Sequence, residues 1–326
     1  MNGPATRPLD RSLLFVTGKG GTGKTTIAAA AALLAAGEGR RVLLVEMDAK
    51  GSLSEALDTA PLEFAPRQVD LPPAFRSAGG ELHVMSMNTE DSLREYLRVI
   101  AKVPLVGRIG PLARTFDFVA DAAPGVKEIL AVGKVCHEVR QRAYDLVIVD
   151  SEASGHVVAQ LDAPRAIRGL VQVGPIREQT EWMLEILGDQ QRTGLLVVTT
   201  PEEMPVTESI ELVGRVRSAT DVLVAGVVAN RVLPRWFAGA DADVFAALAA
   251  THLPAPPAVP RGLEAVVAAA AGVEARRVSG AEQLDHLRAA LPGLPVTVVP
   301  ELYPRAGGRR VAALVAEHLA DEWEAS

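Results

Sequence analysis

A glycine-rich segment near the start of the chain, Gly18 to Thr26, has the residue types of a phosphate-binding loop. It reads GKGGTGKTT and satisfies the pattern G-x-x-x-x-G-K-[ST] between an apolar run and an alanine-rich helical stretch. Glycine lets backbone N–H groups converge on phosphate oxygens where a Cβ atom would obstruct them, and the following helix adds its positive dipole end. The four glycines are Gly18, Gly20, Gly21 and Gly23.

The polar side chains of this loop predict how a nucleoside triphosphate is held. We expect the Lys24 ammonium to bridge the β and γ phosphates and the Thr25 hydroxyl to ligate Mg²⁺. Thr26 is expected to reach the α phosphate, and Thr22 belongs to the same amide-lined loop. The sequence therefore predicts an ATP site with magnesium as its metal.

Two aspartates follow or end apolar runs that are expected to be strands. Asp48 comes after the run 41–46, and Asp150 ends the run 145–150. In doubly wound sheets, ligand groups lie at the carboxyl ends of strands. Hydrolysis of a nucleotide needs one carboxylate for the Mg²⁺ shell and another to position the attacking water, and we assign these roles to Asp150 and Asp48 respectively. Asp48 is also a candidate for the metal site. Alternatively, either aspartate only caps a neighbouring helix.

The elements that must position these residues are short apolar runs alternating with helical segments. Most of the runs are apolar on both faces, which is typical of parallel strands covered by helices on both sides. The sequence thus predicts an α/β fold with a doubly wound, mostly parallel sheet. The expected strands are 13–17, 41–46, 82–87, 145–150, 195–199, 222–230 and 296–299.

Two stretches, 88–140 and 166–190, depart from the strand–helix alternation. We predict that they form a small helical insert beside the ATPase core; the alternative is that both are ordinary helices packed on the sheet. The predicted core comprises residues 12–87, 141–165 and 191–326. The apolar faces at helical spacing are Leu93, Tyr96, Leu97 and Ile100 in the first stretch and Ile176, Thr180, Met183, Leu184 and Leu187 in the second.

Composition excludes several classes of protein. The 326 residues carry 33 basic and 40 acidic side chains, and a net charge of -7 offers no field for nucleic acid. The single cysteine, Cys136, excludes an intrachain disulfide and suits a reducing compartment, so we expect a cytoplasmic protein. The start of the chain has no signal-peptide pattern, and apolar runs such as 27–36 fall short of the roughly 20 residues of a membrane span. We expect no stable membrane insertion.

Taken together, the motifs resemble the ATPases of arsenite pumps and of tail-anchored membrane-protein targeting, a family with a P-loop NTPase fold. In proteins with the KGGxGK[ST] loop, the first lysine reaches the nucleotide of a dimer partner, so the resemblance implies that Lys19 stabilises the transferred phosphoryl group in trans. It also implies that Asp48 activates water, that Asn230 reads adenine and that the loop 300–304 flanks the base. The similarity is carried by VTGKGGTGKTT, VEMDAKGSLSEAL, VIVDSEASGHVV, TTPEEMPVTESIEL and VVANRV.

The chain departs from that family in both switch segments. After Asp48 it has Ala49, Lys50 and Gly51 where the family has Pro-Ala-His, and a second proline is lost next to Glu152. Each lost proline removes a φ restraint, and Glu152 adds negative charge near the expected γ-phosphate. We therefore expect slow or partner-dependent hydrolysis.

The resemblance further implies a homodimer, or a heterodimer with a related ATPase. This dimer is expected to couple ATP turnover to the binding of a hydrophobic protein or peptide client. One alternative is a nucleotide-binding regulatory subunit that pairs with an active paralogue. Another is a positioning ATPase of the partitioning or division-site type, although the end of the chain, Glu322 to Ser326, poorly matches a basic membrane helix. One cysteine is too few for thiolate binding of arsenite or for the cluster of a nitrogenase-like iron protein.

Overall fold

The structure is a computed structural model, which describes most of the chain outside the longer predicted insert. The expected helix from Leu93 to Ile100 and the end of the loop at Pro304 lie outside the described residues. The described residues are 7–48, 50–88, 91–92, 126–170, 174–236, 243–244, 247, 262–303 and 307–324.

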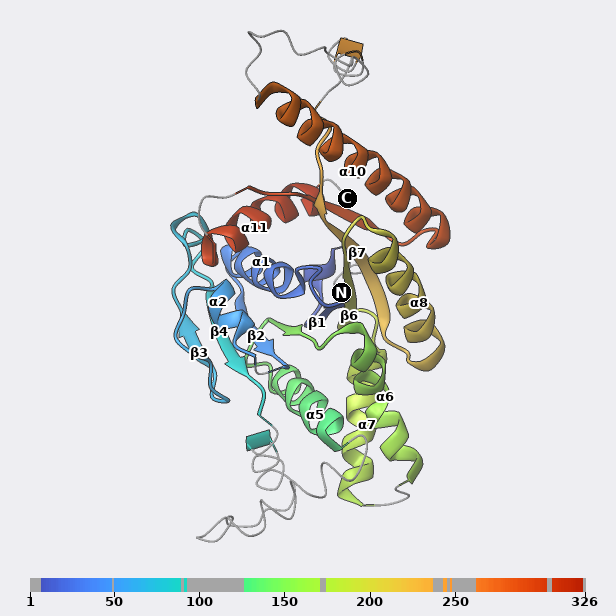
Figure 1. The fold of residues 1–326 in the computed structure, drawn as a ribbon. Coiled ribbons are helices and arrows are strands. Elements are labelled where there is room, and N and C mark those ends of the chain that lie inside the picture. The colour runs from blue at the N-terminus through green and yellow to red at the C-terminus, as the bar shows by residue number, and fades with distance from the viewer. Residues whose placement is uncertain are drawn as a thin grey trace.

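One eight-stranded sheet forms the centre of the molecule (Figure 1). The strand order is β3-β4-β2-β5-β1-β6-β7-β8, and every neighbouring pair is parallel except β3 with β4. The central strand β1 pairs with β5 on one side and β6 on the other. The strands are β1 (Leu13–Gly18), β2 (Arg41–Glu46), β3 (Arg67–Val69), β4 (Glu81–Ser86), β5 (Leu146–Asp150), β6 (Thr193–Thr199), β7 (Leu223–Val232) and β8 (Val296–Pro300).

The predicted fold class is confirmed, and each of the seven expected strands is present with its ends shifted by at most two residues. The antiparallel edge strand β3 was not predicted. It spans three residues, Arg67 to Val69, two of which are exposed. A polar strand of this length has no apolar pattern by which the sequence could reveal it.

Helix α1 (Lys24–Gly37) lies against one face of the sheet, beneath α11 (Arg309–Glu324). Its residues from Ile27 to Ala36 are all buried, and a helix that is apolar all round must be covered on all sides. The small alanine side chains allow close approach to both the sheet and α11. Shorter elements on this face are η1 (Pro8–Asp10), α2 (Ser52–Ala56) and η2 (Pro73–Phe75).

The opposite face of the sheet carries a second hydrophobic core. Its helices are α5 (Val126–Gln141), α6 (Ser154–Leu170), α7 (Pro175–Gly188), α8 (Glu203–Ala219) and α10 (Gly262–Ala290). Alternate residues of β1 point to the two cores, with Leu14 and Val16 in the first and Leu13 and Phe15 in the second. Within the described part of the chain, every helix is too short or too polar to span a bilayer.

The division into a core and a helical insert stays a prediction, because most of the first insert stretch lies outside the described residues. Helix α5, at the end of the first stretch, and helix α7, within the second, both pack on the sheet. Cys136 of α5 and Met183 and Leu187 of α7 are buried in the same core as the strands. Cys136 packs in the core, and burial raises the pKa of its thiol to about 12.

Candidate functional site

The glycine-rich loop joins the end of β1 to the start of α1, as the motif requires. At Gly18 a Cβ atom would lie 2.0 Å from the carbonyl oxygen of Val198, and at Gly23 it would lie 2.3 Å from Nδ2 of Asn230. No described atom comes within 4 Å of a Cβ atom built on Gly20 or Gly21. Gly18 and Gly23 are therefore required by the protein's own packing, whereas Gly20 and Gly21 leave open space above the loop for phosphate.

Thr25, in the first turn of α1, meets Asp150 at the end of β5, where the sequence predicted the metal site. The Thr25 hydroxyl donates to Oδ2 of Asp150 at 2.7 Å. Oδ1 of Asp150 is buried, and no side chain or backbone group among the described residues hydrogen-bonds to it. A threonine hydroxyl beside a carboxylate oxygen without a partner suits Mg²⁺, which takes few protein ligands and completes its shell with water and phosphate.

Burial of Asp150 raises the pKa of its carboxyl group to about 6. The Thr25 hydrogen bond and the Lys24 charge lower this pKa, whereas Glu46 and Asp48 raise it. Burial also lowers the pKa of Lys24. Both groups are thus poorly solvated charges, for which a bound cation and a bound phosphate, respectively, would compensate.

Asp48, the predicted water-positioning residue, forms an ion pair with Lys50 of the same loop. Both side chains are exposed to solvent, and the contact raises the pKa of Lys50. Behind this loop, the buried carboxylate of Glu46 accepts hydrogen bonds from the Leu53 backbone N–H at 3.0 Å and the Ser86 hydroxyl at 3.2 Å. Glu46 therefore fixes the start of α2, just beyond the segment that carries Asp48.

Two long-range contacts hold the loop from the other side. Nδ2 of Asn230 donates to the backbone carbonyl of Thr22 at 2.8 Å. The Lys19 ammonium donates to Oε1 of Glu208 on α8 at 2.6 Å. Inside the loop, the Thr22 hydroxyl and, at 3.4 Å, the Lys24 ammonium donate to the Lys19 carbonyl.

The predicted site residues thus gather at the carboxyl edge of the sheet, with Lys19 directed to α8. Two residues near them were not singled out from the sequence. Glu208 lies inside the quoted segment TTPEEMPVTESIEL, and Glu46 ends the apolar run before Asp48. An acidic residue at the end of a buried strand is a signal that could have identified Glu46. No local signal identifies Glu208, since its partner is 189 positions away.

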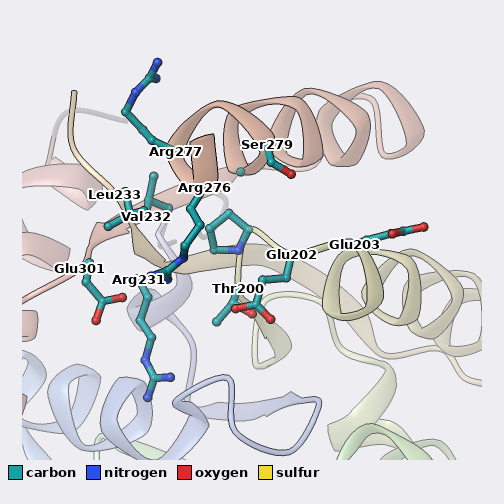
Figure 2. Close-up of a pocket in the computed structure, with 12 residues that line it drawn as sticks. Thr200, Glu202, Glu203, Arg231, Val232, Leu233, Arg276, Arg277, Ser279 and Glu301 are labelled. Atoms are coloured by element: carbon teal, nitrogen blue, oxygen red, sulfur yellow. The ribbon is translucent and has the colours of Figure 1, made fainter. Parts of the chain in front are cut away.

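A cavity of about 380 Å³ lies at the ends of β6 and β7 and under α10 (Figure 2). Thr200, Val232 and Leu233 contribute to its wall, and Glu301, just after β8, closes it. Arg276 points from α10 toward the interior, whereas the neighbouring Arg277 points away. Arg231, the residue that follows Asn230 in the chain, also lines the cavity.

Together, the mainly parallel sheet and the strand–loop–helix at its centre define a P-loop NTPase fold. The chain belongs to the anion-transporting ATPase family, whose model matches residues 11–180. It is 32% identical over 228 residues to ATPase BagA of Mycobacterium tuberculosis. It is 30% identical over 179 residues to ATPase get3 of Schizosaccharomyces japonicus, and 23% identical over 258 residues to an ATPase ASNA1 homolog of Entamoeba dispar.

These matches cover different shares of the chains. The match with BagA covers 68% of this chain and 65% of the mycobacterial protein, so the chain spans just under two thirds of that relative. The match with get3 covers 52% of each chain, and the Entamoeba match covers 68% of this chain and 76% of its relative.

Proposed function

We propose that this chain binds ATP with Mg²⁺ and hydrolyses it. The observation that carries the proposal is the placement of Thr25 against Asp150 directly beneath the glycine loop, with one oxygen of Asp150 buried and without a partner among the described residues. A bound Mg²⁺ would supply charge neutralisation for the phosphates there, held by Thr25 and Asp150. The family and the ATPase names of the relatives support the same activity.

The remaining loop residues have distinct roles in this proposal. The amides of Gly20 to Gly23 surround the phosphates, and Lys24 leaves the Lys19 carbonyl to bind the β and γ phosphates. Thr26 reaches the α phosphate. Once its ion pair with Lys50 has opened, the Asp48 carboxylate positions and deprotonates the attacking water.

The base of the nucleotide occupies the cavity next to Asn230 in this proposal. A volume of about 380 Å³ accommodates a purine and its sugar, and the cavity is lined by Arg231, which follows the residue that the resemblance assigns to adenine. The side chain of Asn230 already holds the Thr22 carbonyl, so base recognition and loop geometry are linked through one residue.

Two variants test the activity. Lys24→Ala should abolish ATP binding, measured by titration calorimetry with Mg²⁺, because it removes the main phosphate cation. Asp48→Asn should retain binding and lose steady-state phosphate release. Asp321→Asn, on an exposed position of α11, serves as the matched control. Unchanged phosphate release by the Asp48 variant would rule out its assigned role.

We further propose that the active form is a dimer in which Lys19 acts on the nucleotide of the partner and which couples turnover to a hydrophobic protein or peptide client. The loop sequence GKGGTGKTT supports the dimer, and the client follows from the family resemblance. Sedimentation velocity with and without a non-hydrolysable ATP analogue tests the dimer. Strictly monomeric, nucleotide-loaded protein would rule it out.

A second candidate function is a regulatory subunit that binds ATP and pairs with an active paralogue. The ion pair between Asp48 and Lys50 favours it, because a carboxylate engaged by a lysine is not free to position the attacking water. Phosphate release by the purified chain that disappears in Lys19→Ala would exclude this candidate. Release that requires an added paralogue would support it.

A further inference from the structure

The Lys19–Glu208 ion pair joins the phosphate-binding loop to helix α8. The ammonium nitrogen lies 2.6 Å from Oε1 of Glu208, and the two side chains are 30% and 34% exposed. The backbone carbonyl of Lys19 accepts hydrogen bonds from Thr22 and Lys24 within the loop. The backbone of Lys19 is therefore fixed inside the loop, while its side chain is directed to α8 of the same chain.

This position conflicts with action on a neighbouring nucleotide. A cation that is already paired with a carboxylate brings little net charge to a second anion, because the two fields largely cancel. To stabilise charge on the phosphates of a partner, Lys19 must first leave Glu208. A triphosphate carries more negative charge than one carboxylate, so the exchange is favourable once the dimer has brought that phosphate within reach.

We propose that Glu208 is a positioning residue that holds Lys19 in a resting position, and that closure of the dimer on ATP exchanges this carboxylate for the partner's phosphate. The inference rests on the proposed function, in which Lys19 acts in trans. It adds a control element: in each chain Glu208 competes for the lysine that acts in trans until a nucleotide-loaded copy is present.

The exposure of the pair sets the size of the effect. Partly exposed ion pairs shift an equilibrium by only about 1.4-fold to 5-fold. Lys19 is then free of Glu208 in roughly one sixth to two fifths of the chains. The apparent affinity of each chain for its dimer partner falls in proportion to that fraction. Since both chains of a dimer must release their lysines, removal of Glu208 should tighten the dimer by about 5-fold to 40-fold.

The test is the dimer dissociation constant of Glu208→Gln, measured by sedimentation with Mg²⁺ and a non-hydrolysable ATP analogue. We expect the variant to dimerise more tightly by the factor above and to release phosphate faster at protein concentrations where the wild type is mostly monomeric. Glu211→Gln, exposed one turn further along α8, is the matched control and should behave as the wild type. Added salt should narrow the difference between Glu208→Gln and the wild type.

The same substitution in a Lys19→Ala background separates the resting contact from a general effect on α8. If Glu208 acts through Lys19, Glu208→Gln changes nothing when Lys19 is absent. The inference is overturned if the single variant matches the wild type or weakens the dimer, or if it still tightens the dimer without Lys19. Should Lys19→Ala alone leave dimerisation and turnover unchanged, the proposed trans role itself fails.

Discussion

Asn230, near the carboxyl end of β7, hydrogen-bonds to the carbonyl of Thr22 and thereby fixes the phosphate-binding loop from 208 positions away. The same side chain occupies the space where Gly23 would carry a Cβ atom, with Nδ2 at 2.3 Å from that point. Gly23 also has a φ of 92°, in the left-handed region. Gly23 and Asn230 therefore depend on each other, and the loop that opens α1 is built around their contact.

Gly23→Ala should lower the thermal stability of the protein and reduce its affinity for ADP at least tenfold. The left-handed backbone alone costs about 1–2 kcal/mol for alanine, and Asn230 must also move away from Thr22. Adding Asn230→Ala should recover only part of the stability, since the collision is relieved and the backbone strain is not. Differential scanning calorimetry measures the stability, and titration calorimetry measures the affinity.

Gly20→Ala is the matched control for stability, because no described atom lies within 4 Å of its Cβ position. Its melting temperature should equal that of the wild type. A Gly23→Ala protein with the same melting temperature as the wild type would contradict the packing argument.

Lys50→Met should raise the rate of phosphate release by about twofold to fivefold at low salt, since it frees the Asp48 carboxylate from an exposed ion pair. The advantage should disappear at high salt, where the wild-type pair is screened. Arg288→Met, which removes a surface ion pair on α10, is the control. Slower release by the Lys50 variant would show instead that Lys50 assists the reaction.

Asp150 should make Mg²⁺-dependent nucleotide binding sensitive to pH near 6. Its pKa of about 6 leaves the carboxylate ionised at pH 7.5 and mostly protonated at pH 5.5. The gain in ADP affinity from Mg²⁺ should fall about fourfold between these values, in line with the ionised fraction. Calorimetric titrations at both pH values check this, and Asp150→Asn should lose both the gain and its pH dependence.

The raised pKa of Asp150 also predicts how the folding stability of the nucleotide-free protein depends on pH. The pKa of Asp150 rises from its ordinary value of 3.8 on folding, so its stabilising contribution is complete below pH 3.8 and is lost as the pH rises through about 6. At pH 7.5 the buried carboxylate therefore destabilises the fold relative to its protonated form, on the order of 3 kcal/mol. Asp150→Asn should melt at a higher temperature than the wild type without nucleotide; a lower melting temperature would contradict this.

The Cys136 thiol should resist alkylation and disulfide-exchange reagents at pH 8 in the native protein. It is fully buried, and its pKa of about 12 leaves almost no thiolate. In denaturant the single thiol should react at once, which provides the internal control. Rapid stoichiometric labelling under native conditions would show that α5 opens readily from the sheet.

Much of this site could be predicted from the sequence, because the determinants are local. Phosphate binding by backbone amides requires glycines at fixed spacing, so the segment from Gly18 to Thr26, which follows a buried strand, predicts the loop. Asp150 could be placed near Thr25 because it ends β5, the parallel neighbour of β1, and β1 runs into the loop and the first turn of α1 that carries Thr25. The buried strands themselves were evident from runs that are apolar on both faces.

Only the tertiary structure decided which side chains hold the loop and its lysine. Glu208 and Asn230 lie 189 and 208 positions from their partners, and no periodicity relates residues that meet only after β6, α8 and β7 have packed. The loop's affinity for phosphate follows from its own composition. The direction in which Lys19 points follows from a carboxylate on a distant helix, because the geometry of an ion pair depends on the positions of both elements that carry it.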